Sequence, residues 1–219
     1  MRTVLRMAML CLVFIGLGST VAHAANTPDL TQQITAGTLS TDILDNNRAT
    51  VATPSAALSS KSFSFSCQSG GSASTGTLGT NTQRLYVMNP DNADNGWTLT
   101  IAATTGATTR WENTGATQFF DFNDAGGSGC TDGGDADSSA GQLSLDPSVG
   151  TITTDCLSCT STGVTLGSSS AFSQGVTDSL TLINAGAGSN DIWRGYLTNV
   201  GLSQTIPAEQ AVDNYDINF

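Results

Sequence analysis

The chain contains few of the side chains that most enzymes use for catalysis. It has one histidine, one lysine and two glutamates among 219 residues, and charged residues make up only 11% of it. The histidine, His23, lies in a segment that we expect to be removed, which excludes Ser-His-Asp and Cys-His arrangements and imidazole zinc sites from the remaining chain. The aspartates lie among Gly, Ser and Asn, a pattern typical of solvated loops. We therefore expect a protein that is not an enzyme.

Long hydrophobic runs are also missing, apart from a short one at the N-terminus. Arg2 and Arg6 precede the apolar residues 7–17, and Ala22-His23-Ala24 follows as a small-residue cleavage site. This order is typical of a secretory signal peptide, here residues 1–24. A membrane-spanning helix needs about 20 apolar residues. We therefore expect a secreted or cell-surface protein with no transmembrane segment after cleavage.

Positive charge is scarce. Once residues 1–24 are removed, five basic residues remain against eighteen acidic ones, a formal charge of −13. A chain of this sign repels phosphate backbones and anionic lipid surfaces. We expect neither nucleic acid nor a membrane surface as a partner, and cations as the natural ligands.

Helical periodicity is absent, and apolar residues instead alternate with Ser and Thr in short runs. Period two is typical of strands that are packed on one face and solvated on the other. We predict an all-β fold, an antiparallel β-sandwich of about eight to ten strands, as a single domain over residues 25–219. The predicted inward-facing sets are Phe63, Phe65 and Cys67; Trp97, Leu99 and Ile101; Leu143 and Leu145; Val164 and Leu166; Leu180 and Leu182; and Tyr215, Ile217 and Phe219.

Weaker patterns complete this prediction. Residues 33–44 are predicted as the first strand, and residues 199–210 as a strand broken at Pro207. Clusters of Gly, Ser, Asn and Thr predict turns at residues 68–82 and 184–191.

Four cysteines survive signal removal, an even number that favours disulfides in an exported chain. Four cysteines allow three pairings; in one of them Cys156 and Cys159 close a tight local loop, which leaves Cys67 to pair with Cys130. A redox pair or a zinc site is the alternative, but a redox Cys-x-x-Cys normally opens a helix in an α/β domain, and no such pattern is visible.

An acidic segment at residues 119–146 is a candidate calcium site. Its carboxylates and flexible glycines suit calcium, although their spacing does not match an EF-hand loop. The alternative is a set of solvated turns in which Asp and Asn side chains cap their own backbone. The candidate ligands are Asp121, Asp124, Asp132, Asp135 and Asp137.

Four stretches together resemble the WxL-like surface proteins of bacteria, especially versions in predicted proteins of candidate phyla with small genomes. They are residues 81–104 (NTQRLYVMNPDNADNGWTLTIAAT), 120–124 (FDFND), 130–150 (CTDGGDADSSAGQLSLDPSVG) and 206–219 (IPAEQAVDNYDINF). The resemblance covers most of residues 30–219, and Trp97 and Leu99 form its Trp-x-Leu motif.

The resemblance implies a β-rich module of exported proteins that attaches non-covalently to the cell wall. In that family two Trp-x-Leu motifs are implicated and peptidoglycan is the proposed ligand. This chain departs from the pattern, because residues 214–219 (NYDINF) contain no tryptophan where a second motif is expected.

Aromatic residues outside the motif are the candidate contacts for glycan. Trp97 shares its face with Leu99 and Ile101, so we expect it in the core. Trp111 and Trp193 lie beside turns and next to arginines, and with Tyr196 they are the candidate binding residues. Packing at the rim of the sandwich is the alternative role for them.

Two functions from different classes remain. One is a non-catalytic module that binds the cell envelope through wall glycan. The other is a structural, assembly or adhesive protein of the surface layer, stabilised by calcium, whose partner is itself or another surface protein.

Overall fold

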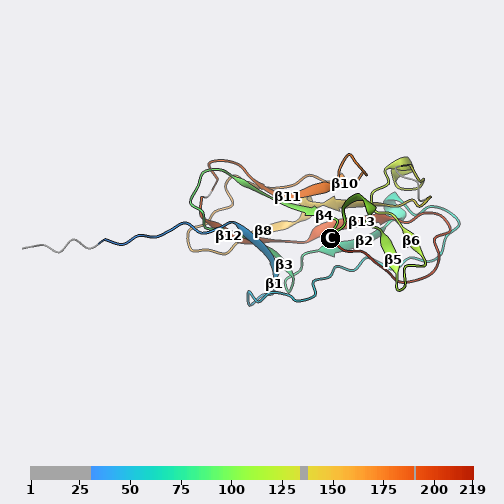
Figure 1. The fold of residues 1–219 in the computed structure, drawn as a ribbon, viewed down its shortest axis with the longest axis horizontal. Coiled ribbons are helices and arrows are strands. Elements are labelled where there is room, and N and C mark those ends of the chain that lie inside the picture. Colours follow the sequence, from blue (N-terminus) through green and yellow to red (C-terminus); the bar gives the residue numbers. More distant parts are fainter. Residues whose placement is uncertain (1–30, 134–137, 190) are drawn as a thin grey trace, which may run out of the picture. The chain divides into compact units, whose positions relative to one another are not determined.

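A computed structural model describes residues 31–133, 138–189 and 191–219, and the predicted signal peptide lies outside them. The chain divides into two units, Met1–Thr35 and Ala36–Phe219. The described residues of the first unit, 31–35, are exposed and have no regular secondary structure. In the second unit, antiparallel sheets pack together without any α-helix in the described residues, which confirms the predicted fold class (Figure 1).

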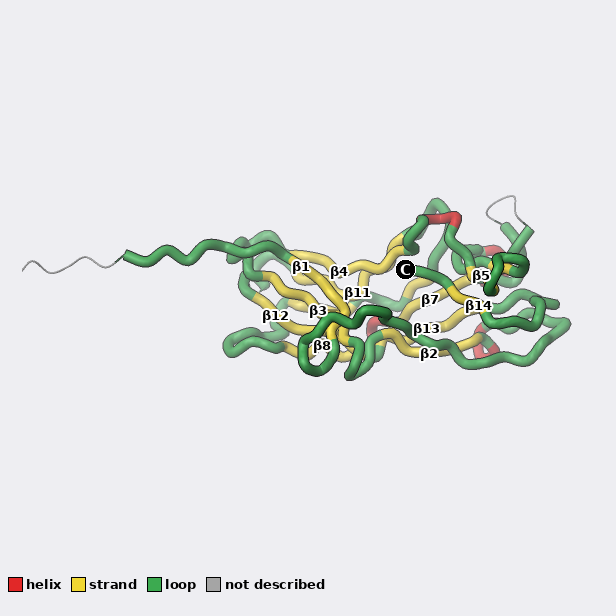
Figure 2. Tube along the Cα trace, turned by 60° about the horizontal axis from the view of Figure 1, so that its bottom comes forward, coloured by secondary structure: helices red, strands yellow, loops and turns green. Residues whose placement is uncertain are grey.

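The regular elements are short strands and single 3-10 turns (Figure 2). No helix in the described ranges is long and apolar enough to cross a membrane. The strands are β1 Ser40–Leu44, β2 Ser74–Leu78, β3 Arg84–Asn89, β4 Trp97–Ala102, β5 Trp111–Asn113, β6 Phe119–Phe120, β7 Gln142–Asp146, β8 Thr151–Thr154, β9 Val164–Leu166, β10 Ser170–Ala171, β11 Ser179–Ala185, β12 Trp193–Thr198, β13 Val200–Thr205 and β14 Tyr215–Asp216. The 3-10 turns are η1 Gly70–Ser72, η2 Gly106–Thr108, η3 Gly126–Ser128 and η4 Pro147–Val149.

Two of the four sheets join end to end around one nearly continuous central strand. Only Asn199, in a left-handed conformation with φ 63°, separates β12 from β13. One sheet has the order β1-β3-β12-β8, and the other has the order β10-β7-β13-β2. The neighbours of the central strand are interrupted at the same level, between β2 and β3 and between β7 and β8. If each interrupted pair is counted as one strand, the fourteen strands of the described residues become eleven, one more than the upper end of the predicted eight to ten.

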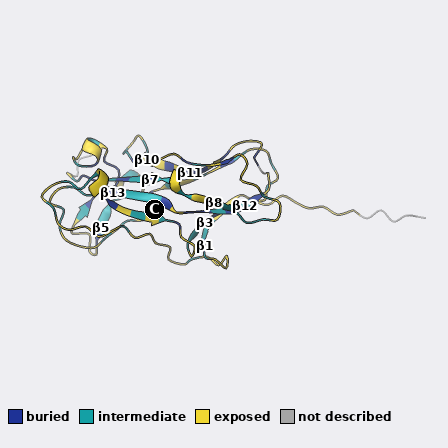
Figure 3. Ribbon diagram, turned by 180° about the vertical axis from the view of Figure 1, so that it is seen from behind, coloured by how far each residue is buried: buried dark blue, intermediate teal, exposed yellow. Residues whose placement is uncertain are grey.

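The remaining sheets, β4-β11-β9 and β14-β5-β6, supply the opposing layer. Trp97 on β4 and Trp193 on β12 meet across the layers, with ring centroids 5.1 Å apart. Beside the sheet β10-β7-β13-β2, the Trp111 Nε1 on β5 donates a hydrogen bond to the Gln204 Oε1 on β13 at 2.8 Å. Burial alternates along β7, whereas exposed residues gather in the connections (Figure 3).

Alternation predicted the faces of several strands correctly. In β4, Trp97 is buried and Leu99 and Ile101 are half-buried, while the threonines between them are exposed. Leu143 and Leu145 on β7 are buried, and β9 and β11 lie where they were predicted. Pro207 follows the end of β13, as expected.

Other strand predictions were wrong. Residues 61–67 form no strand, and Phe63 and Phe65 are 47% and 79% exposed. Their alternation has no partner strand, so the two rings pack against each other instead, edge to face at 5.0 Å. The predicted turn cluster at residues 68–82 contains β2, whose five residues pair with β13. The predicted first strand, residues 33–44, begins only at Ser40.

Candidate functional site

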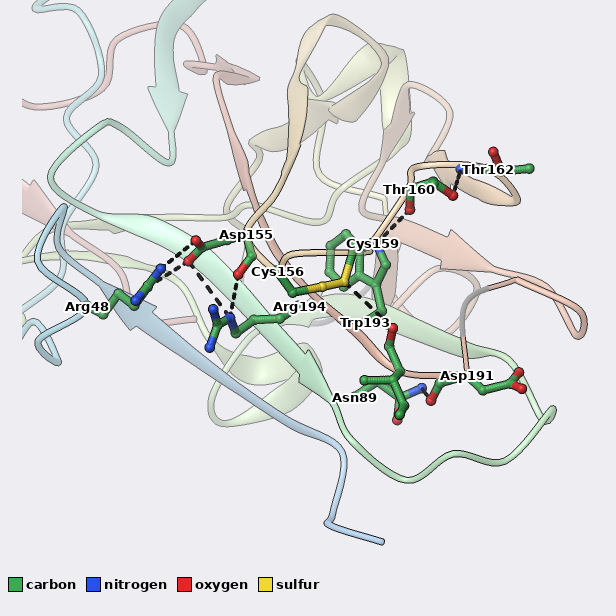
Figure 4. The surroundings of a disulfide bond; sticks show 11 residues. Arg48, Asn89, Asp155, Cys156, Cys159, Thr160, Thr162, Asp191, Trp193 and Arg194 are labelled. Carbon is green, nitrogen blue, oxygen red and sulfur yellow. Dashed lines mark hydrogen bonds and ion pairs between the residues drawn. A yellow bond between two sulfur atoms is a disulfide. The ribbon is translucent and has the colours of Figure 1, made fainter. Parts of the chain in front are cut away.

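Trp193 is not available as a contact for glycan, contrary to the prediction. Its side chain is 1% exposed, and its ring packs on Trp97. The indole Nε1 donates to the Thr160 carbonyl at 3.1 Å, so its polar atom is also occupied (Figure 4). The turn that precedes Trp193 suggested that the residue is exposed. Trp193 is instead the first residue of β12, and its ring points into the core.

Trp97 of the Trp-x-Leu motif is a core residue, as its alternation predicted. It is 7% exposed, and its backbone pairs with Ala185 of β11. The preceding Gly96 has φ +67°, and a Cβ there would lie 2.5 Å from the Ala185 carbonyl oxygen. Glycine at 96 therefore allows the close approach that starts β4.

Trp111 and Tyr196 keep part of their surface exposed. The Trp111 ring stacks on Phe120 at 5.8 Å, in addition to its bond to Gln204. Tyr196 lies on the outer face of its sheet, where Tyr86 stacks against it at 5.8 Å and the Arg84 guanidinium lies 4.4 Å from its ring centre. The structure does not bring these two predicted residues together, since they belong to different sheets.

The acidic segment is divided between buried and exposed aspartates. Asp121 and Asp124 are 3% and 0% exposed, whereas Asp132 is exposed. Asp135 and Asp137 lie outside the described residues. Within the ranges that are described, no group of three His, Cys, Asp or Glu residues is placed to hold a metal ion. Burial of Asp121 and Asp124 corrects the expectation of a wholly solvated loop, and calcium binding stays a prediction.

Both predicted disulfides are present. Cys67 pairs with Cys130, and Cys156 with Cys159. The first joins the segment before β2 to the acidic segment. The second closes the loop after β8 beside Trp193 (Figure 4). Pairing of all four cysteines agrees with export to an oxidising compartment.

An ion pair joins the two edges of the sheet β1-β3-β12-β8. Arg48, in the loop after β1, donates from Nε and Nη2 to both carboxylate oxygens of Asp155, at 2.7 and 2.6 Å. Arg194 donates from Nε to the Asp155 carbonyl oxygen at 2.6 Å. The hydrogen bond from Arg48 lowers the pKa of Asp155 below its ordinary value of 3.8. The loop after β1 is thereby held to the residue that follows β8 (Figure 4).

Replacing Asp155 with asparagine should lower the free energy of unfolding by about 1 kcal/mol at pH 7, because the pair is partly exposed but bidentate. The folded-state pKa is depressed, so this contribution is complete above pH 3.8 and is lost as the pH falls below it. Urea melts at pH 7 and pH 2.5 measure the difference. Glu209→Gln, at an exposed carboxylate, is the matched control, and an equal Asp155→Asn deficit at both pH values would contradict the role of the ion pair.

An apolar groove of about 980 Å³ lies between the layers. Most of the apolar residues that line it are only half-buried, although they face inward. Its walls combine aliphatic side chains with aromatic and polar ones, and residues 53–58 and 214–219 border it. The lining aliphatic residues are Ile43, Leu58, Leu78, Leu85, Ile101, Leu143, Leu145, Leu202 and Ile217.

One wall of the groove belongs to a strand with an open edge. Among the described strands, β4 pairs only with β11, and its Ile101 lines the groove. The C-terminal residues contact the chain just after β4, where the Thr104 amide donates a hydrogen bond to the Asn218 carbonyl at 3.2 Å. The edge from Trp97 to Ala102 is left without a strand beside it.

Sequence reasoning did not find the groove. Alternation identified Ile101 as inward-facing, but it could not show that the space opposite would stay uncovered. That depends on which strands lie next to β4, and strand order is not a local property of the sequence.

Comparison of the chain with models of protein families, with curated proteins and with solved structures finds no match.

Proposed function

We propose that this chain is an exported, non-catalytic structural module that takes up a β-strand from a partner along the open edge of β4. The observation that carries the proposal is the coincidence of an apolar groove of about 980 Å³ with an unpaired strand edge. An added strand would hydrogen-bond to β4 through its backbone and place alternate side chains in the groove. It would also cover Ile101, Leu202 and the other half-buried residues.

A strand fits the groove better than a sugar or a small molecule does. Nine isoleucine and leucine side chains line the groove, against three aromatic residues, Trp111, Tyr215 and Phe219, that could stack on a sugar ring. A volume of about 980 Å³ is at the upper end of the roughly 300–1,000 Å³ of ligand pockets. A small apolar molecule would cover the side chains but leave the amide and carbonyl groups of β4 without partners.

Two observations support a position at the cell exterior. The disulfides Cys67–Cys130 and Cys156–Cys159 need an oxidising compartment. The resemblance to WxL-like surface proteins gives the same location. Wall glycan is the alternative partner that this resemblance implies, and burial of Trp193 leaves Trp111 and Tyr196 as its aromatic candidates.

A peptide of alternating valine and threonine tests strand uptake. We expect it to slow hydrogen exchange at the β4 amides and to raise the melting temperature as its concentration rises, because it binds only the folded chain. The same peptide should have no effect on Ile101→Arg, which places a charged side chain in the groove.

Three outcomes would contradict this function. The peptide could leave the β4 amides unprotected, or an apolar small molecule could co-purify in stoichiometric amount and compete with it. Sedimentation of the wild-type chain with wall sacculi, undiminished in Ile101→Arg and lost in Tyr196→Ala, would favour the glycan module instead.

A further inference from the structure

We infer that the strand taken up in the groove is residues 31–39 of a second copy of this chain, so that copies join head to tail. This inference rests on the proposed function and names its partner. The segment has the sequence TQQITAGTL and directly precedes β1.

Residues 31–39 have a strand-like sequence but no strand to pair with in the described structure. The alternating pattern predicts a strand from residue 33, whereas β1 begins at Ser40. Every residue from 31 to 39 is exposed, and Ile34 is 89% exposed. Apart from the Gly37 amide, which bonds to the Pro90 carbonyl, an extended, exposed segment with a strand pattern offers its backbone groups for pairing with another chain.

Residues 36–39, the part of the segment that belongs to the second unit, continue β1 on the side away from the groove. Ile43, near the end of β1, lines the groove, as does Leu85 near the start of β3. Gly37 instead donates its amide to the Pro90 carbonyl at 2.9 Å, beyond the far end of β3. Pairing of residues 36–39 with the groove of their own chain would require a reversal of direction before Ser40, whereas pairing with another copy requires none.

The chemistry of the segment suits an apolar groove. It contains no charged residue in a strongly acidic chain, so its insertion leaves no buried charge uncompensated. In an extended conformation Ile34 and Ala36 lie on one face. Nine residues extend to about 30 Å, enough to follow the six residues of β4, which span about 20 Å.

Such contacts are heterologous, since the donor segment and the acceptor groove are different surfaces of the molecule. Repetition of a heterologous contact that does not close a ring generates an open chain. Each copy would supply a strand to one neighbour and receive one from another.

A mixing experiment tests the inference on the chain that begins at Ala25, produced by export so that both disulfides form. Wild-type protein should form a concentration-dependent ladder in sedimentation velocity. Ile34→Asp, a donor variant, and Ile101→Arg, an acceptor variant, should each associate at least about 100-fold more weakly on their own, because a charge would enter the groove. An equimolar mixture should give one-to-one dimers and no longer species, since it retains one intact donor and one intact groove.

Val176→Asp is the matched control, because Val176 is 82% exposed and is not among the residues that line the groove. Its ladder should equal that of the wild type. Ile43→Arg serves as a second acceptor variant if Ile101→Arg folds poorly.

The inference is overturned if the wild type stays monomeric up to millimolar concentration or if Ile34→Asp leaves the ladder unchanged. In either case, protection of β4 by the valine–threonine peptide would keep strand uptake and exclude only this donor. Absence of that protection as well would remove both proposals.

Discussion

Replacing Trp97 with alanine should lower the free energy of unfolding by about 3–5 kcal/mol, the cost of removing a large aromatic ring from a packed core. Trp97 is 7% exposed and packs on Trp193, which is 1% exposed, so its loss leaves a cavity between the two layers. Because a domain of this size is stabilised by only about 5–15 kcal/mol, the variant should be close to unfolding at 37 °C. Urea melts of wild type and variant measure the effect.

Trp97→Phe is the control, since it keeps an aromatic ring against Trp193 and should cost much less than alanine. It also removes the indole Nε1, which is buried without a hydrogen-bond partner among the described residues. An unchanged midpoint for Trp97→Ala, together with lost binding to wall sacculi, would show that the Trp-x-Leu motif contacts a ligand and is not part of the packing.

Removing the Cys67–Cys130 disulfide should lower the free energy of unfolding by about 4 kcal/mol. The bond closes a loop with a sequence separation of 63 residues, and the entropy that a disulfide removes from the unfolded chain grows with loop length. The double variant Cys67→Ser and Cys130→Ser, purified under the same conditions as the wild type, tests this by thermal and urea melts. Its acidic segment should also become more sensitive to proteolysis.

The matched comparison is Cys156→Ser with Cys159→Ser. That disulfide closes a loop with a separation of only 3 residues, so the same relation predicts a loss of about 1.6 kcal/mol. A larger loss from the short loop than from the long one would contradict an entropic origin and would point to packing of the loop after β8 against Trp193.

The sequence alone determined features that depend on near neighbours along the chain. Period two placed Trp97, Leu99 and Ile101 on one face of β4, and it predicted the buried faces of β7 and β11. Local spacing also favoured one disulfide, because Cys156 and Cys159 are close enough to pair with each other, but the structure was needed to choose among the three pairings that four cysteines allow. In both cases the covalent chain itself limits where a side chain can point or reach.

Only the tertiary structure decided which of the alternating segments pair with another strand. Phe63 and Phe65 alternate as clearly as Trp97 and Leu99, but no strand pairs with them and they stay exposed. The residues of β2 lie in a stretch predicted as turns and form a strand because β13 lies beside them. Strand pairing is made between segments far apart in the sequence, so alternation is necessary for a half-buried strand but does not ensure one.

The groove could not be predicted from the sequence for the same reason. Alternation along the sequence correctly predicted that Ile101 faces inward. The turn and the arginine beside Trp193 led to the wrong prediction that Trp193 lies at the surface. The central position of β12 buries Trp193, while the edge position of β4 leaves Ile101 beside an open groove. The order of strands in the sheets decides whether an inward-facing residue is covered, and that order follows from long-range pairing that no local pattern encodes.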